Sequence, residues 1–272
     1  MTTLRLPMFL KMENEIKDYS WGSMNSIEKL FGIKSKHQKP QAEIWMGAHP
    51  DGCSKVLIND EEIYLSQFIN GAPDLILGED TLDKFGELPY LFKVLAAEKS
   101  LSVQVHPNKE QAECGYEKEN ELKIPLSASH RNFKDPNHKP ELVFALTEYK
   151  AMNGFREIDE ILSIFDSMGL ESVKDAVKKL GKSPSSEGLR EFFGEILSLN
   201  GDDKKEAIEE LISYASDNKN DELFSLILDL DEQHKGDVGL FSPLMLNVVT
   251  LNPGEAMFLE ACTPHAYIKG TG

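Results

Sequence analysis

The segment at residues 101–107 carries the polar side chains best placed to do chemistry in this sequence. We predict a β-strand here, because apolar and polar residues alternate and Pro107 would end the strand by removing a hydrogen-bond donor. The apolar residues then face a core, while Ser102, Gln104 and His106 stand in a row on the opposite face. An amide oxygen and an imidazole on one face can bind a metal ion. An ordinary half-buried strand with a solvated polar face is the alternative interpretation.

Two later segments add ligands of the same kind. Glu141 stands at the start of an apolar run at residues 141–146, and His265 follows another apolar run beside a proline. Together with Gln104 and His106, they would provide two imidazoles, one carboxylate and one amide oxygen. This set suits a divalent first-row metal, zinc above all, with room left for water or substrate. We predict one zinc ion per chain, held by these four residues.

Several short motifs resemble those of type I mannose-6-phosphate isomerases, a family of zinc-dependent cupin enzymes. They occur in the family's order and cover the chain from near Asp18 to its last residues, apart from a variable middle. The motifs are residues 18–23 (DYSWGS), 42–50 (AEIWMGAHP), 91–95 (LFKVL), 101–108 (LSVQVHPN), 137–141 (NHKPE), 253–256 (PGEA) and 263–267 (TPHAY). The resemblance implies a mainly β fold, a cupin-type β-sandwich or jelly roll with an inserted α-helical domain.

The resemblance also implies an activity. The family interconverts mannose 6-phosphate and fructose 6-phosphate, moving a proton between C1 and C2 through an enediol after the sugar ring opens. A metal would polarise the sugar oxygens as a Lewis acid. A sugar phosphate is then the small-molecule partner. By the same resemblance, we expect Lys93, Ser102 and Lys139 to bind substrate and act in catalysis. Trp21 and Glu43 are expected in or around the same pocket.

The charge balance restricts how an anionic sugar could bind. The 272 residues include 29 Lys and Arg against 46 Asp and Glu, a formal net charge of -17. Such a field disfavours nucleic acid, anionic membranes and, at long range, a sugar phosphate itself. A phosphate site must therefore be a local basic pocket. Lys93 and Lys139 are the candidate cations within the matched motifs, and the Ser102 hydroxyl is a further donor.

Cysteine usage and hydropathy predict the compartment. Cys53, Cys114 and Cys262 are odd in number and widely spaced, which indicates a reduced, intracellular protein. For Cys262, close to His265, we expect a small buried hydrophobe, with a thiolate ligand as the alternative. The N-terminus lacks a secretory signal pattern, and no run is long enough to span a membrane. We predict a cytoplasmic protein, monomeric or weakly homo-oligomeric, without nucleic-acid or membrane partners.

Three blocks of elements must bring the site residues together. Residues 1–150 read as short strands between turns, an N-terminal cupin portion with the metal-site strands. Residues 151–236 change to helical spacing, with about four helices between 156 and 230, and form a helical insertion. A lid or partner surface is the functional alternative for this packed block. Residues 237–272 return to strands, an incomplete second cupin portion that must pack back on the first for His265 to reach the other ligands.

Local signals predict several boundaries. Short helices are expected at residues 26–31 and 108–114, the second capped by Asn108. Residues 203–206 resemble a helix-starting capping box, and residues 253–254 suit the centre of a type II turn.

The sequence departs from the family pattern at its end. In the family, the segment with the final histidine continues through a glutamate and, further on, an arginine that contributes to catalysis, whereas this sequence stops at Gly272. We therefore expect a C-terminally truncated form with slow or absent turnover. The rival interpretation is a regulatory or degenerate cupin that holds metal or sugar without turnover. An oxygenase of the metal-cupin class is the third alternative. The Gln-x-His segment and the two lysines favour a sugar phosphate as substrate over oxygen chemistry.

Overall fold

The computed structural model describes residues 9–35 and 37–272. Of these residues, 42% are helical and 21% lie in strands, so the expectation of a mainly β chain is too narrow. Residues 1–8, on which the expectation of no secretory signal partly rests, lie outside the described residues. No helix within 9–35 and 37–272 is long and apolar enough to cross a membrane. The chain forms two compact units, Met1–Glu98 with Gly270–Gly272, and Lys99–Lys269.

The first unit contains two small antiparallel sheets and short helices. One sheet has the order β2–β3–β6, and the other has the order β1–β4–β5. The elements are β1 (Met12–Glu13), β2 (Glu15–Lys17), α1 (Ser26–Phe31), β3 (Glu43–Met46), β4 (Lys55–Ile58), β5 (Glu61–Tyr64), α2 (Leu65–Gly71), α3 (Pro73–Leu77), α4 (Glu79–Phe85) and β6 (Phe92–Ala97). Helix α1 has the predicted bounds and ends at Gly32, whose φ of 71° is the left-handed conformation that glycine adopts readily.

The strands of the second unit frame the candidate site. Strand β7 pairs with β10, and β8 lies between β9 and β11. The elements are α5 (Lys109–Glu121), β7 (Glu141–Phe144), β8 (Tyr149–Phe155), β9 (Leu246–Leu251), β10 (Ala256–Leu259) and β11 (His265–Thr271). Between β9 and β10, Gly254 has φ 95° and the Glu255 N–H donates to the Asn252 carbonyl at 3.0 Å, which agrees with the predicted type II turn.

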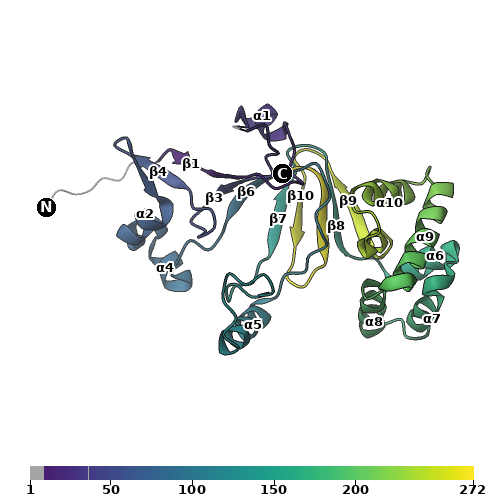
Figure 1. Ribbon diagram of the computed structural model, residues 1–272. Helices are drawn as coiled ribbons and strands as arrows, with labels where there is room; N and C mark the ends of the chain where they lie inside the picture. The colour runs from purple at the N-terminus through teal and green to yellow at the C-terminus, as the bar shows by residue number, and fades with distance from the viewer. Residues whose placement is uncertain (1–8, 36) are drawn as a thin grey trace. The chain divides into compact units, whose positions relative to one another are not determined.

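A block of helices lies between β8 and β9 in the sequence (Figure 1). It consists of α6 (Ile158–Met168), η1 (Glu171–Val173), α7 (Lys174–Lys182), α8 (Ser186–Leu197), α9 (Gly201–Asp217), α10 (Glu222–Gln233), η2 (Val238–Phe241) and α11 (Ser242–Met245). These helices share one apolar core, which includes Phe165, Phe192, Leu211 and Ile227. The block therefore has five long helices where about four were expected.

The predicted capping box at residues 203–206 is wrong. Helix α9 begins at Gly201, after Asn200, so Asp203 already lies in its first turn. Aspartate is favourable there because the unpaired N–H groups at a helix N-terminus carry partial positive charge. Acidic residues are thus compatible with both the N-cap and the first turn of a helix. The predicted helix start therefore lies about one turn after the observed one.

Candidate metal centre

Strand β11 separates the helical core from the candidate site. Ala266 and Ile268 belong to the apolar core of the second unit. His265 and Tyr267 alternate with them, so their side chains leave the opposite face of the strand. Both are largely buried, with 3% and 7% exposure. Packing of Ala266 and Ile268 in the core fixes the strand. The side chains of His265 and Tyr267 are thereby held in position on its opposite face.

The segment at residues 101–106 is not the regular strand that we predicted. It meets β11 through one isolated bridge, in which Gln104 and His265 exchange both backbone hydrogen bonds, at 2.8 and 2.9 Å. Further along, the Cys262 N–H donates to the His106 carbonyl at 2.7 Å. Val105 is 54% exposed and so does not seal a core. The segment is held by scattered bonds to the β11 region, which still bring Gln104 and His106 to it.

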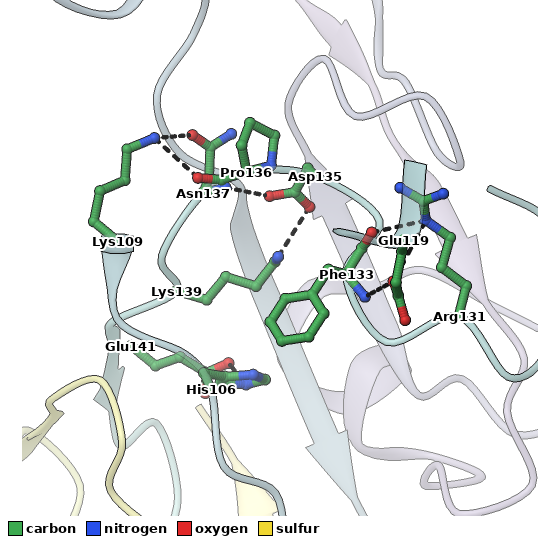
Figure 2. Close-up of polar contacts among 10 residues, drawn as sticks. All are labelled: His106, Lys109, Glu119, Arg131, Phe133, Asp135, Pro136, Asn137, Lys139 and Glu141. Atoms are coloured by element: carbon green, nitrogen blue, oxygen red, sulfur yellow. Dashed lines mark hydrogen bonds and ion pairs between the residues drawn. The ribbon is translucent and has the colours of Figure 1, made fainter. Parts of the chain in front are cut away.

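Three predicted ligands converge. The donor atoms of His106, Glu141 and His265 all lie within 4.8 Å of one another. One Glu141 oxygen is 3.2 Å from His106 Nε2, and the other is 3.8 Å from His265 Nε2. Figure 2 shows the Glu141 carboxylate beside the His106 ring. Tetrahedral zinc bonds of about 2.0–2.1 Å place neighbouring donor atoms roughly 3.3 Å apart. The spacing of this triad therefore suits a first-row metal.

His265 is prepared for a metal by its hydrogen bonding. Its Nδ1–H donates to the Thr263 carbonyl oxygen at 2.8 Å, which leaves the lone pair on Nε2. Nε2 is buried and makes no hydrogen bond. A buried nitrogen lone pair without a partner is costly, unless a ligand such as a metal ion satisfies it. Metal-bound histidines commonly show this arrangement, with the second ring nitrogen bonded to a backbone carbonyl.

Glu141 is held in its charged form. Burial alone raises the pKa of its carboxyl, but hydrogen bonds from His106 and Tyr267 and the two nearby imidazoles outweigh burial, so the net pKa is below its usual value. A carboxylate is the form that binds a metal. Burial, reinforced by Glu141, raises the pKa of the Tyr267 hydroxyl, so this group stays protonated and donates.

The role of Tyr267 was missed by the sequence reasoning. Its hydroxyl donates to one oxygen of the Glu141 carboxylate, while His106 contacts the other, so the two residues together orient this group. The available signal was its position two residues after His265, which puts both side chains on one face of a strand.

Gln104 lies directly opposite His265. In a pair that exchanges both backbone hydrogen bonds, the two side chains leave on the same side and start close together. Gln104 is thus paired through its backbone with a member of the triad, its side chain is exposed, and its ligation remains a prediction. Cys262 is exposed, so the expected small buried hydrophobe is wrong. Its thiol contacts the Gln111 side chain, with 3.1 Å between Sγ and Oε1.

The predicted substrate residues fall into two sets. Ser102 and Lys139 lie with the four predicted ligands in the second unit, and both are exposed. The first unit contains Trp21, Glu43 and Lys93. There, Lys93 Nζ is 3.6 Å from the buried Glu43 carboxylate.

The Glu43 carboxylate also accepts the indole N–H of Trp45 at 2.6 Å. The Lys93 ammonium lies 4.7 Å from the centre of the Trp45 ring, a cation–π distance. Trp21 stacks on Tyr19 at 5.6 Å between ring centres. Glu43 and Lys93 thus form one polar cluster of the first unit, with Trp45 as its aromatic wall.

Helix α5 supports the loop that leads to Glu141. Residues 122–140 contain no helix or strand, a length that needs an external support. The Glu119 carboxylate of α5, 8% exposed, accepts the backbone N–H groups of Asn132 and Phe133 at 3.0 and 2.8 Å. Arg131 lies 3.6 Å from Glu119 and donates to the Phe133 carbonyl (Figure 2). A Cβ on Gly115 of α5 would lie 2.5 Å from the Phe133 ring, so ring and helix are in close contact.

We expect the Glu119 contacts to make stability depend on pH. The backbone N–H of Asn132 is the main cause that lowers the pKa of Glu119 below its usual value, ahead of the opposing effect of burial. A carboxyl whose pKa is lower in the folded state than in the unfolded state stabilises the fold at pH values above the unfolded-state pKa. This stabilisation is lost as the pH falls through the folded-state pKa. Urea unfolding of Glu119→Gln from pH 7 to pH 3 should show a smaller loss of stability on acidification than the parent. Glu117→Gln, on the exposed side of α5, should behave like the parent; identical pH profiles for all three proteins would contradict the assignment.

Known proteins match nearly the whole length of this chain. A family model described as phosphomannose isomerase type I, catalytic domain, matches residues 9–158, and one for the helical insertion domain of that family matches residues 168–246. The mannose-6-phosphate isomerase of Salmonella typhimurium is 45% identical over 261 residues, which are 96% of this chain and 66% of that protein. The chain thus spans slightly less than two thirds of that relative.

Solved structures give the same result. A zinc-bound mannose 6-phosphate isomerase matches with a TM-score of 0.91 and 45% identity, over 96% of this chain and 66% of that one. The Salmonella typhimurium enzyme bound to its substrate fructose 6-phosphate and zinc matches with a TM-score of 0.90, at the same identity and coverage. The resemblance carried by the short motifs is therefore confirmed. The chain belongs to the type I phosphomannose isomerase family.

Proposed function

We propose that this chain carries a zinc site for the interconversion of mannose 6-phosphate and fructose 6-phosphate. The carrying observation is the convergence of His106, Glu141 and His265, with the buried His265 Nε2 left free for a metal. The relative with bound zinc and fructose 6-phosphate supports both the metal and the substrate class. Gln104 is proposed as the fourth ligand, so that one zinc ion binds per chain.

The roles of the other residues follow from their chemistry. Zinc, when bound, would act as a Lewis acid toward the sugar oxygens. Tyr267 keeps the Glu141 carboxylate oriented by donating a hydrogen bond to it. Lys139 and Lys93 supply positive charge for the phosphate or for oxygens that become more negative during reaction, and Ser102 supplies a hydroxyl. Glu43 holds the Lys93 ammonium, and Trp21 forms part of the wall around the substrate.

The finer architecture is proposed with it. Residues 1–150 would form an N-terminal cupin portion, 151–236 a helical insertion and 237–272 part of a second cupin portion. The strands would then belong to a cupin-type β-sandwich. We also propose a cytoplasmic protein, monomeric or weakly homo-oligomeric, with no nucleic-acid or membrane partner, in keeping with its net charge of -17.

The deciding experiment measures metal and turnover on the same sample. Zinc is quantified by elemental analysis, and fructose 6-phosphate formation from mannose 6-phosphate is followed by a coupled assay. We expect about one zinc per chain and slow turnover that chelation abolishes and zinc restores. Zinc without turnover would favour the metal-holding cupin instead. Absence of both would contradict the proposed function.

A further inference from the structure

Asp135 makes two bonds at the end of the loop that leads to Glu141. One carboxylate oxygen accepts the Asn137 backbone N–H at 2.9 Å, which closes a tight turn. The other oxygen accepts the Lys139 ammonium, also at 2.9 Å. Figure 2 shows the Lys139 side chain turned toward this carboxylate. Asp135 therefore both shapes the turn and holds the cation that we assign to the phosphate.

The backbone on each side of Asp135 is fixed to helix α5. Two residues earlier, the Phe133 N–H donates to the buried Glu119 carboxylate at 2.8 Å. One residue later, the Lys109 ammonium donates to the Pro136 carbonyl at 2.9 Å. Both partners belong to one helix of 13 residues, whose start is capped by Asn108. These two contacts therefore fix the backbone that positions the Asp135 carboxylate.

Lys139 is the more exposed partner of this pair. Its side chain is 47% exposed, and its pairing with Asp135 spans four residues of an exposed loop. Exposed pairs of this kind change an equilibrium constant by a factor of only about 1.4 to 5. Lys139 precedes Pro140, which favours extended backbone, and stands two residues before Glu141. Its stem therefore leaves the chain on about the same side as Glu141 and can swing toward a ligand there.

We infer that Asp135 is an internal counter-ion of Lys139, which the phosphate of the substrate displaces. The inference rests on the proposed function, because it takes a sugar phosphate as the ligand. A dianionic phosphate competes for the ammonium better than one carboxylate does, whereas a neutral sugar cannot compete for it. Asp135 thereby determines specificity. Anions that compete weakly for the Lys139 ammonium do not displace Asp135 from it, whereas a phosphate does.

The test variant is Asp135→Asn. Its amide oxygen can still accept the Asn137 N–H, so the turn is kept and only the charge is lost. With zinc-loaded protein in a titration calorimeter, we expect the Kd for fructose 6-phosphate to fall by the factor of about 1.4 to 5 that such an exposed pair contributes, which corresponds to about 0.2–1 kcal/mol. The Kd for fructose should not change. Asp175→Asn on α7 is the matched control, because it removes one charge from another exposed pair, with Lys178 at 3.9 Å.

A second readout separates this inference from the proposed function. Acetylation of Lys139 by an amine-reactive reagent is quantified by peptide mass spectrometry while inorganic phosphate is added. We expect phosphate to protect Lys139, with half-maximal protection at a lower concentration in Asp135→Asn than in the parent. If phosphate protects in this way but fructose 6-phosphate does not bind, the proposed function fails and the counter-ion role stands. Unchanged or weaker phosphate protection in the variant, or no protection in either protein, overturns the inference.

Discussion

Replacing His265 with alanine is expected to lower zinc affinity by more than about 100-fold. The expectation follows because loss of an outer hydrogen-bond partner alone costs roughly 10- to 100-fold, and His265 supplies a donor atom itself. Stability should fall in parallel, since a ligand that binds only the folded state stabilises it. At a zinc concentration of about 100 Kd, this contribution is about 2.7 kcal/mol. Elemental analysis after dialysis and thermal unfolding with and without zinc measure the two effects.

His106→Ala should show the same loss, and His138→Ala supplies the control. His138 is exposed and stands three residues before Glu141, so it tests whether any nearby imidazole would serve. We expect the His138 variant to keep its zinc and its unfolding temperature. Full stoichiometric zinc in both the His106 and His265 variants would rule out the proposed ligand set.

Lys139→Ala is expected to weaken fructose 6-phosphate binding by roughly 10- to 100-fold, with little effect on fructose. A hydrogen bond to a charged group contributes about 1.5–3 kcal/mol, and the neutral sugar does not use it. Lys93→Ala should act in the same direction, with zinc content unchanged. Calorimetric titrations with both ligands on zinc-loaded proteins measure the difference.

Lys134→Ala is the matched control for Lys139, because it removes another exposed lysine from the same loop and changes the net charge equally. Its binding of both sugars should equal that of the parent. If Lys139→Ala lost the two sugars to the same extent, the lysine would not recognise the phosphate.

The sequence predicted the chemistry of the centre better than the backbone that positions it. His106, Glu141 and His265 were identified from residue type and neighbouring apolar runs, and the structure brings them within 4.8 Å. The alternation at residues 101–106 nevertheless suggested a ladder strand, whereas one bridge to His265 is formed. Whether an extended segment finds a continuous partner depends on tertiary pairing, which alternation alone cannot specify.

A buried charged residue was the second feature that the sequence did not predict. Helix α5 was expected to cover residues 108–114, but it continues to Glu121. Its second half is polar, and Glu119 reads as a solvated side chain because glutamate is seldom buried. Only the loop that returns over α5 supplies the Arg131 and backbone partners that make its burial favourable. Such partners are distant in the chain, so a local pattern carries no sign of them.

Gly115 sets a limit on engineering this helix for thermostability. Exchanging a mid-helix glycine for alanine usually gains up to about 1 kcal/mol, so α5 would be an obvious target. Here the added methyl group would meet the Phe133 ring at 2.5 Å, and the ring carries the loop that leads to Lys139 and Glu141. A more stable helix would therefore be obtained only by displacing the segment that serves the metal centre, so a design library should keep position 115 as glycine.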